Sequence, residues 1–133
     1  MHIMTVKAKK MTANVLTTIL FLAFVVSGFM KLMRTDDAVE GFRRYDLNVG
    51  ILMLIGFLEV LGGLGLWLPK VRIWAAAGLS AIMTGAIVIH LYHDEANMIA
   101  APLVFFILLM VSISLRLQLN KLPKQKRKNR KNE

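Results

Sequence analysis

Four apolar segments, each about as long as a bilayer is thick, constrain this chain more than any other feature. They occupy residues 11–33, 49–68, 72–92 and 98–118, and hydrophobic residues make up 56% of the chain. A helix needs about 20 mainly apolar residues to cross the hydrocarbon core, where irregular backbone would leave its polar groups without partners. The sequence therefore predicts an all-α polytopic membrane protein. A four-helix transmembrane bundle would fill residues 1–118, with a basic tail over 119–133.

The distribution of Lys and Arg predicts how the bundle is oriented. Thirteen of these residues precede the first span, separate the second from the third, or follow the fourth; only four lie in the two remaining loops. Basic residues in short loops favour the cytoplasmic side. We therefore expect both termini in the cytoplasm and a multi-pass location in the cell (cytoplasmic) membrane.

The basic tail carries much of the net charge of +9. Residues 121–133 hold seven Lys/Arg and one acid. Such a segment can bind nucleic acid, but beside a transmembrane span it is more typical of contact with anionic lipid headgroups. The bilayer and these headgroups are the expected partners, nucleic acid is disfavoured, and membrane protein partners or a homo-oligomer are left open.

The loop between the first two spans, residues 31–48, is too long for a tight turn. Thr35 followed by Asp36 and Asp37 is typical of a helix start, because acids favour the first turn. Val39, Phe42 and Tyr45 then recur at three-residue spacing. This pattern predicts a short interfacial helix, with an irregular loop as the alternative.

Glu59 is the only charged residue between Val49 and Leu68, and it lies at the centre of that span. A charge at the bilayer centre costs roughly 2.5–3.5 kcal/mol on insertion scales, so Glu59 should face the bundle interior. Lys31 at the end of the first span and His90 near the end of the third are candidate neighbours. Because Glu59 lies roughly 15 Å below the start of its helix, a direct Lys31 contact requires tilt or an inward reach.

Lys31, Glu59 and His90 are each open to a structural and a functional interpretation. Lys31 is long enough to snorkel to headgroups, His90 is suited to an interface, and a neutral Glu59 can orient the bundle. Functionally, Glu59 is a candidate proton acceptor or anchor for a polar ligand group. A Glu59–His90 pair would also suit quinone carbonyl or hydroxyl groups.

Small residues recur on the same helices and predict close helix packing. Gly56, Glu59 and Gly63 share one helix face, and glycine lets neighbouring backbones approach in membranes. We assign this packing role to six positions, which are Gly28, Gly56, Gly62, Gly63, Gly78 and Gly85.

Several chemistries are disfavoured at once. The chain has no Cys, which excludes disulfides and thiolate sites, and its three His form no HxxxH pair. We predict no metal site and no catalytic residue, and the chain is more typical of a binding or assembly protein than of an enzyme.

Three motifs in order carry a resemblance to a known family. They are Gly28-Phe29-Met30-Lys31-Leu32, then Glu59-Val60-Leu61-Gly62, then Gly85-Ala86 ahead of His90. Over residues 12–118 the chain resembles the DoxX-like family of small four-span membrane proteins. The resemblance implies a four-helix bundle and directs attention to Lys31, Glu59 and His90.

The resemblance also implies a role. The family is associated with membrane redox and stress-response complexes, so we expect a non-catalytic accessory or assembly subunit. One alternative is a quinone- or lipid-binding redox subunit using Glu59 and His90, with quinone as the candidate cofactor. Another is a small proton-coupled transporter acting as an oligomer.

Overall fold

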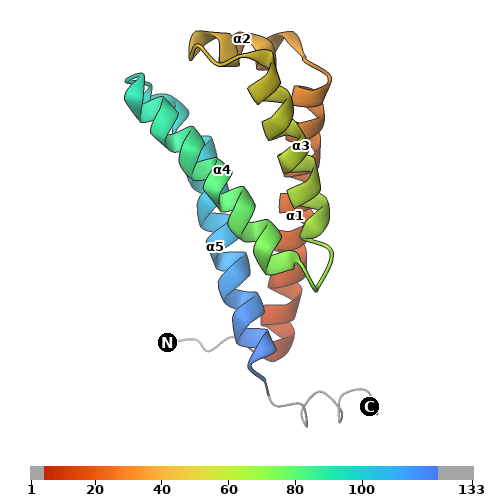
Figure 1. Ribbon diagram of the computed structural model, residues 1–133. Helices are drawn as coiled ribbons and strands as arrows, with labels where there is room; N and C mark the ends of the chain where they lie inside the picture. The colour runs from red at the N-terminus through yellow and green to blue at the C-terminus, as the bar shows by residue number, and fades with distance from the viewer. Residues whose placement is uncertain (1–4, 123–133) are drawn as a thin grey trace.

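The protein is built from helices alone in the part of the chain that the computed structural model describes, residues 5–122 (Figure 1). The long helices are α1 (Val6–Leu32), α3 (Val49–Gly65), α4 (Arg72–Tyr92) and α5 (Ala100–Asn120). Two short ones, α2 (Asp36–Arg44) and the 3-10 helix η1 (Ala96–Met98), lie in the connections. The all-α prediction is confirmed. Most of the predicted tail, residues 123–133, lies outside the described residues.

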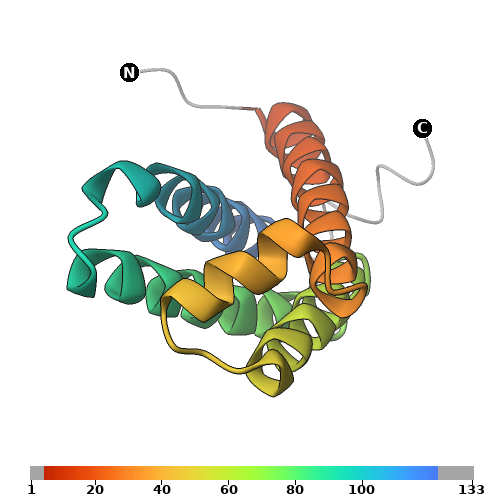
Figure 2. The same ribbon diagram turned by 90° about the horizontal axis from the view of Figure 1, so that it is seen from above.

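The four long helices form a ring in which each contacts two others. α1 packs on α3 and α5, and α4 packs on α3 and α5. Figure 1 shows the α4–α5 pair leaning away from α1 and α3 towards the end where α2 lies. Seen from above in Figure 2, α2 crosses this wider end. The bundle is therefore narrow near the chain termini and splayed beneath α2.

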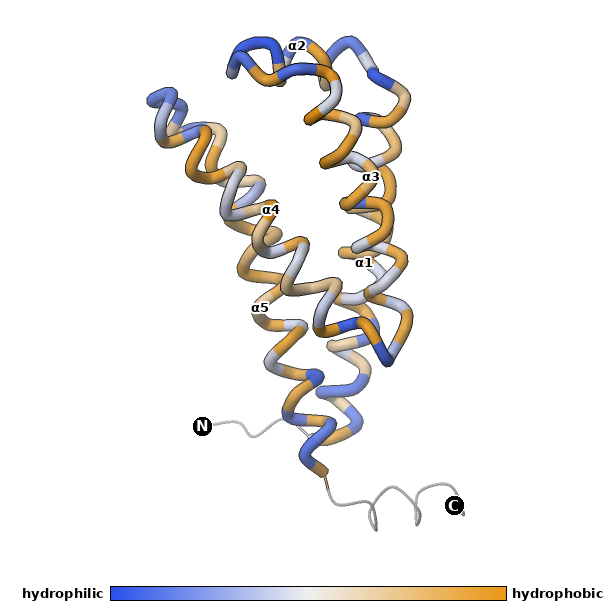
Figure 3. Tube along the Cα trace, viewed as in Figure 1, coloured by the Kyte–Doolittle hydropathy of each residue, from blue (hydrophilic) through white to orange (hydrophobic). Residues whose placement is uncertain are grey.

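The outer surface of the bundle matches a lipid environment. Figure 3 shows hydrophobic residues along the helices and hydrophilic ones gathered at both ends. Large apolar side chains are exposed on every long helix, including Leu22, Leu54, Val88 and Val104. Lipid would cover them in the membrane, where exposed apolar surface is the rule. An α-helical membrane bundle is confirmed.

The number of full spans depends on how α3 is counted. α1, α4 and η1 with α5 are long and apolar enough to cross a membrane. α3 has 17 residues and qualifies only together with α2, from which it turns by 119°. Its length of about 25 Å is a little short of a hydrocarbon core of about 30 Å. The apolar turn Leu66–Leu68 follows it.

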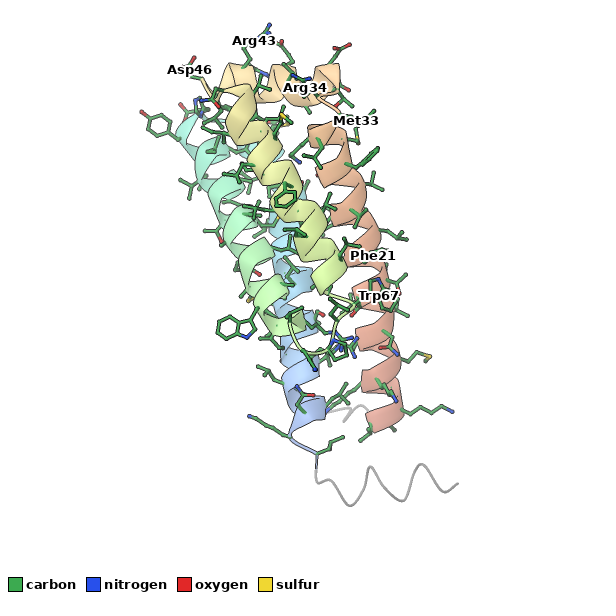
Figure 4. The ribbon with its side chains drawn as sticks, turned by 45° about the vertical axis from the view of Figure 1, so that its right-hand side comes forward. Phe21, Met33, Arg34, Arg43, Asp46 and Trp67 are labelled. Atoms are coloured by element: carbon green, nitrogen blue, oxygen red, sulfur yellow. The ribbon has the colours of Figure 1, made fainter. Side chains whose placement is uncertain are left out.

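Local sequence explains where the helices begin and end. The side-chain oxygens of Thr5 and Asn48 accept backbone N–H groups of Ala8 and Ile51 at the starts of α1 and α3. Pro102 lies in the first turn of α5, where its missing N–H costs no helical hydrogen bond. Arg34 and Asp46 adopt left-handed backbone angles after α1 and α2, and Figure 4 shows them flanking α2.

The buried core fills the narrow half of the bundle. Its cluster joins all sides of the ring through Leu20, Phe24, Leu66, Ala76, Leu79, Met83 and Leu109. The ring of Trp67, in the α3–α4 turn, meets Phe21 edge-on at 5.7 Å (Figure 4). Side chains from every long helix or its adjoining turn therefore close the interior towards the termini. The space that remains lies under α2.

Candidate functional site

A cavity of about 560 Å³ lies between the splayed helix pairs and beneath α2, and we call it the α2 cavity. α1, α2, α3, α4, η1 and α5 all contribute to its wall. Most of the wall is apolar, with Ile55, Met83, Ile89 and Phe105 among its residues. A mostly apolar, concave space with a few polar groups is typical of a small-molecule site.

A polar triad of Ser27, Lys31 and Glu59 lies in the wall of this cavity. Lys31 Nζ donates to Glu59 Oε2 at 2.9 Å and to Ser27 Oγ at 2.8 Å. Ser27 Oγ in turn donates to the same Oε2 at 3.1 Å. The side chain of Glu59 is only 3% exposed and that of Lys31 is 19% exposed. The pair is thus a largely buried ion pair with a supporting hydroxyl.

Two glycines bring the helices close enough for this contact. A Cβ on Gly28 would lie 2.5 Å from the carbonyl oxygen of Gly56, and a Cβ on Gly56 would lie 2.8 Å from that of Gly28 and from Lys31 Cβ. Any larger residue would push α1 away from α3. Lys31 is therefore level with Gly56, about one turn above Glu59.

The directions of the two side chains bridge the one-turn offset between Lys31 and Glu59. Helical side chains tilt towards the N-terminus of their own helix. α1 and α3 run in opposite directions (Figure 1), so Lys31 tilts down while Glu59 tilts up, and the two charges meet. The inward reach that the contact required is thus supplied by helix geometry.

The triad has unused hydrogen-bonding capacity inside the cavity. Glu59 Oε2 accepts both bonds, and Oε1 has no hydrogen-bond partner among the described residues. An ammonium has three protons, and Lys31 uses two. The site therefore offers one acceptor and one donor side by side to a polar group that enters the cavity.

His90 also lines the cavity but belongs to a second group, the Tyr45 cluster of Arg44, Tyr45, His90 and Glu95. Its Nδ1 lies 3.1 Å from Tyr45 Oη and 3.2 Å from Glu95 Oε2. Tyr45 donates to the same Oε2, and Arg44 Nη1 lies 3.7 Å from Glu95 Oε1. The cluster ties the end of α2 to the α4–η1 turn at the mouth of the cavity.

Position along the helices separates His90 from the triad. His90 is two residues from the end of α4, whereas Glu59 is ten residues into α3. At 1.5 Å per residue their depths differ by roughly 12 Å. The structure therefore joins Lys31 to Glu59 and places His90 above them, across the same cavity.

Within the Tyr45 cluster, the pKa values of Glu95 and Tyr45 are both shifted from their ordinary values. The hydrogen bond from Tyr45, followed by the contact with His90, lowers the pKa of Glu95. Burial, followed by the hydrogen bond to Glu95, raises the pKa of Tyr45. A neutral phenol and an ionised carboxylate are therefore the stable pair at the cavity mouth.

Sequence reasoning missed Glu95 and placed Tyr45 only on the apolar side of a short helix. The two are 50 residues apart, and no local pattern links them. The one available signal for Glu95 was its position five residues after His90, near the end of a predicted helix. The turn that ends α4 brings Glu95 back beside His90. Ser27 was visible one turn before Lys31.

The six glycines assigned to packing divide into two groups. A Cβ on Gly62 or Gly63 would come within 3.0 Å of a side chain of a neighbouring helix, and a Cβ on Gly28 or Gly56 would meet backbone oxygen at 2.5 or 2.8 Å. A Cβ on Gly78 or Gly85 would meet nothing within 4 Å. Gly85 instead borders the α2 cavity, so its lack of a side chain makes room there.

The arginines at the narrow end donate hydrogen bonds within the protein, although Nε of Arg116 is buried and has no hydrogen-bond partner among the described residues. Arg116 Nη2 donates to Asn14 Oδ1 at 3.1 Å and to Thr17 Oγ1 at 2.9 Å. Arg72 Nε donates to the carbonyl of Leu66 at 2.7 Å. Over residues 5–122 no cluster of three or more His, Asp or Glu residues could hold a metal ion.

Together, apolar outer faces, a buried ion pair and an internal cavity define an α-helical membrane protein with a candidate site for a small polar group. Residues 15–112 match the model of the DoxX-like family. The chain therefore belongs to the DoxX-like family. It is 31% identical over 93 residues to the uncharacterized protein YdgD of Bacillus subtilis (strain 168), covering 67% of this chain and 81% of that protein. No solved structure matches the chain.

Proposed function

We propose that this protein is a non-catalytic membrane subunit that binds one quinone- or lipid-like molecule in the α2 cavity. The observation that carries the proposal is the free Oε1 of Glu59, held beside Lys31 in a space of about 560 Å³. Oε1 faces the cavity on a side chain that is only 3% exposed, so the hydroxyl of a ligand in the cavity would donate a hydrogen bond to it. A ligand carbonyl would suit the remaining proton of Lys31.

Quinones fit this pair because they present carbonyl groups when oxidised and hydroxyl groups when reduced. The apolar wall would accommodate the ring, and Ile55, Met83 and Phe105 supply such surface. His90 and Tyr45 lie at the mouth, where they would contact the opposite polar edge of a ring or headgroup. This arrangement gives Glu59 and Lys31 the anchoring role and His90 a secondary one.

The wider setting of the proposal is the cytoplasmic membrane, with both termini in the cytoplasm and the α2 end outside. An accessory subunit of a membrane redox or stress-response complex would use such a site to hold a lipid-soluble molecule near its partners. The proton-coupled transporter is less well supported, because a buried apolar cluster that includes Leu20, Leu79 and Leu109 occupies the bundle interior on the far side of the triad.

The proposal is tested by mass spectrometry of small molecules that co-purify with the full chain from native membranes. The variant is Glu59→Gln, which keeps the shape but removes the charge. Glu40→Gln makes the same change on an exposed position of α2 and is the matched control. We expect a prenyl quinone or one defined lipid with the wild type and with Glu40→Gln, reduced at least tenfold with Glu59→Gln. The same extract from all three folded proteins would contradict the proposal.

A further inference from the structure

A second space lies on the outer surface directly beside the α2 cavity. It is a groove of about 680 Å³ between α1 and α5, under the start of α2, and we call it the α1–α5 groove. Its wall shares five residues with the cavity wall, which are Ser27, Lys31, Asp37, Ala38 and Phe105. These five residues border both spaces, and two of them belong to the polar triad.

The groove faces lipid over most of its length. Leu22 and Val26 of α1 line it and are 55% and 56% exposed. In a membrane they would lie against acyl chains. Polar side chains lie at the α2 end of the groove, which Lys31 and Thr35 both line, and the buried Oγ1 of Thr35 has no hydrogen-bond partner among the described residues. The groove is thus apolar along the membrane and polar where it joins the cavity.

The surface groove between α3 and α4 lacks these features. It has a volume of about 500 Å³, and its wall shares only Ile82 with the α2 cavity. Among the described residues, no charged side chain lines it, and its one side-chain polar atom is the indole N–H of Trp74. A lipid-soluble molecule would find no charged anchor there and no link to the triad, so the two sides of the bundle are not equivalent.

We propose that the α1–α5 groove is a lateral portal and tail site for the ligand of the α2 cavity. The inference rests on the proposed function. The head group binds Lys31 and Glu59 inside, and a single alkyl or isoprenoid tail leaves past Phe105 and lies along Leu22 and Val26. The ligand class is therefore a single-tailed, lipid-soluble molecule that arrives from within the bilayer.

The test is photo-crosslinking of the full chain in lipid nanodiscs. The probe is a benzoquinone with a decyl tail that ends in a diazirine, and the competitor is unlabelled decyl-benzoquinone in excess. We expect labelling of α1 between Leu22 and Met30, or of α5 next to Phe105, that the competitor suppresses at least tenfold. Glu59→Gln should abolish this labelling.

Blocking the groove provides the matched comparison. Ala23→Trp fills the α1–α5 groove, and Ala81→Trp makes the same change in the α3–α4 groove. We expect Ala23→Trp to reduce the competed labelling at least tenfold and Ala81→Trp to leave it unchanged. Val26→Trp, at a position 56% exposed, repeats the block if Ala23→Trp does not fold.

The other outcomes separate the two proposals. Competed, Glu59-dependent labelling elsewhere on the chain would overturn the portal and leave the cavity site standing. Groove labelling that ignores both the competitor and Glu59→Gln would show ordinary lipid contact and overturn the portal. Absence of any competed labelling in the wild type would overturn the portal, and the co-purification experiment, which detects lipids as well as quinones, would then decide the proposed function.

Discussion

The contact between α1 and α3 is rich in small residues and so is helix α4, but the small residues have opposite effects in the two places. Between α1 and α3, Gly28 and Gly56 let two backbones touch, which places Lys31 against Glu59. On α4, Gly78 and Gly85 border open space. A glycine in a membrane helix can therefore close a helix contact or keep a cavity open. Only the register of the opposing helix decides which.

The charged groups follow the same division. The ion pair of Lys31 and Glu59 is held by the tight side of the molecule, whereas His90 is held at the looser side by Tyr45 and Glu95. A shift of α1 against α3 would therefore disrupt the anchor itself. A shift of α2 would change the cavity mouth, and a shift of α4 would also move Met83 and Ile89 in the cavity wall, but neither helix contributes a residue to the ion pair.

The largest expected effect is at Gly28. Gly28→Ala places a Cβ 2.5 Å from the Gly56 carbonyl and 2.9 Å from the backbone nitrogen of Val60, and backbone atoms cannot rotate away. Overpacking of this kind costs about 1–3 kcal/mol. We expect a lower thermal midpoint in detergent and loss of co-purifying ligand. Measured stability equal to the wild type would show that α1 and α3 do not touch at this level.

A smaller, pH-dependent effect is expected at the Tyr45 cluster. A carboxyl with a lowered pKa stabilises the fold above its ordinary pKa, and that contribution is lost as the pH falls through the lowered value. The pKa of Glu95 is lowered, so its contribution fades at acidic pH, below about 4. The pKa of Tyr45 is raised, so its contribution is intact below its ordinary value of about 10 and is lost as the pH rises through the raised one. The protection factors of the α2 amides, which are exchange rates corrected for the intrinsic effect of pH, should be highest between these limits.

Tyr45→Phe checks the origin of that pH dependence. It removes the phenol that bonds to Glu95 and His90 but keeps the ring, so roughly fivefold faster exchange of α2 is expected at neutral pH. Tyr92→Phe is the control, because Tyr92 is 84% exposed and belongs to no hydrogen bond of the cluster. Equal exchange in the two variants would mean that the cluster does not hold α2 down.

Much of the fold was predictable because bilayer-length apolar segments admit few alternatives. The third span was predicted as 72–92, which matches α4, and the second ended three residues beyond Gly65. The short helix expected after Thr35 forms as α2, although Thr35 makes no capping hydrogen bond. Hydrophobic length and start signals are local, so one sequence contains them.

The site was predictable in composition but not in pairing. Glu59 stands out as a lone charge in an apolar span, and Lys31 and His90 follow as polar residues near the ends of theirs. The pairing depends on helix register, which Gly28 and Gly56 set only after α1 and α3 have met. The His90–Tyr45 contact depends further on where α2 lies, across 45 residues of chain. Such long-range geometry leaves no periodic trace in a single sequence.

The smallest effect is expected on the open face of α4. Gly78→Ala and Gly85→Ala each add a Cβ that meets nothing within 4 Å, so neither should strain the fold. Alanine favours helix over glycine by up to about 1 kcal/mol, which makes stability equal to or slightly above that of the wild type. Gly85→Ala also takes a little volume from the α2 cavity, whereas Gly78→Ala does not, because Gly78 lines the α3–α4 groove instead. Thermal melts of both variants, with ligand content measured beside them, therefore distinguish the two roles of glycine. Equal stability in both, with less ligand only in Gly85→Ala, would support an open cavity at that position. Destabilisation of either variant would mean that α4 packs against a neighbour that this structure lacks.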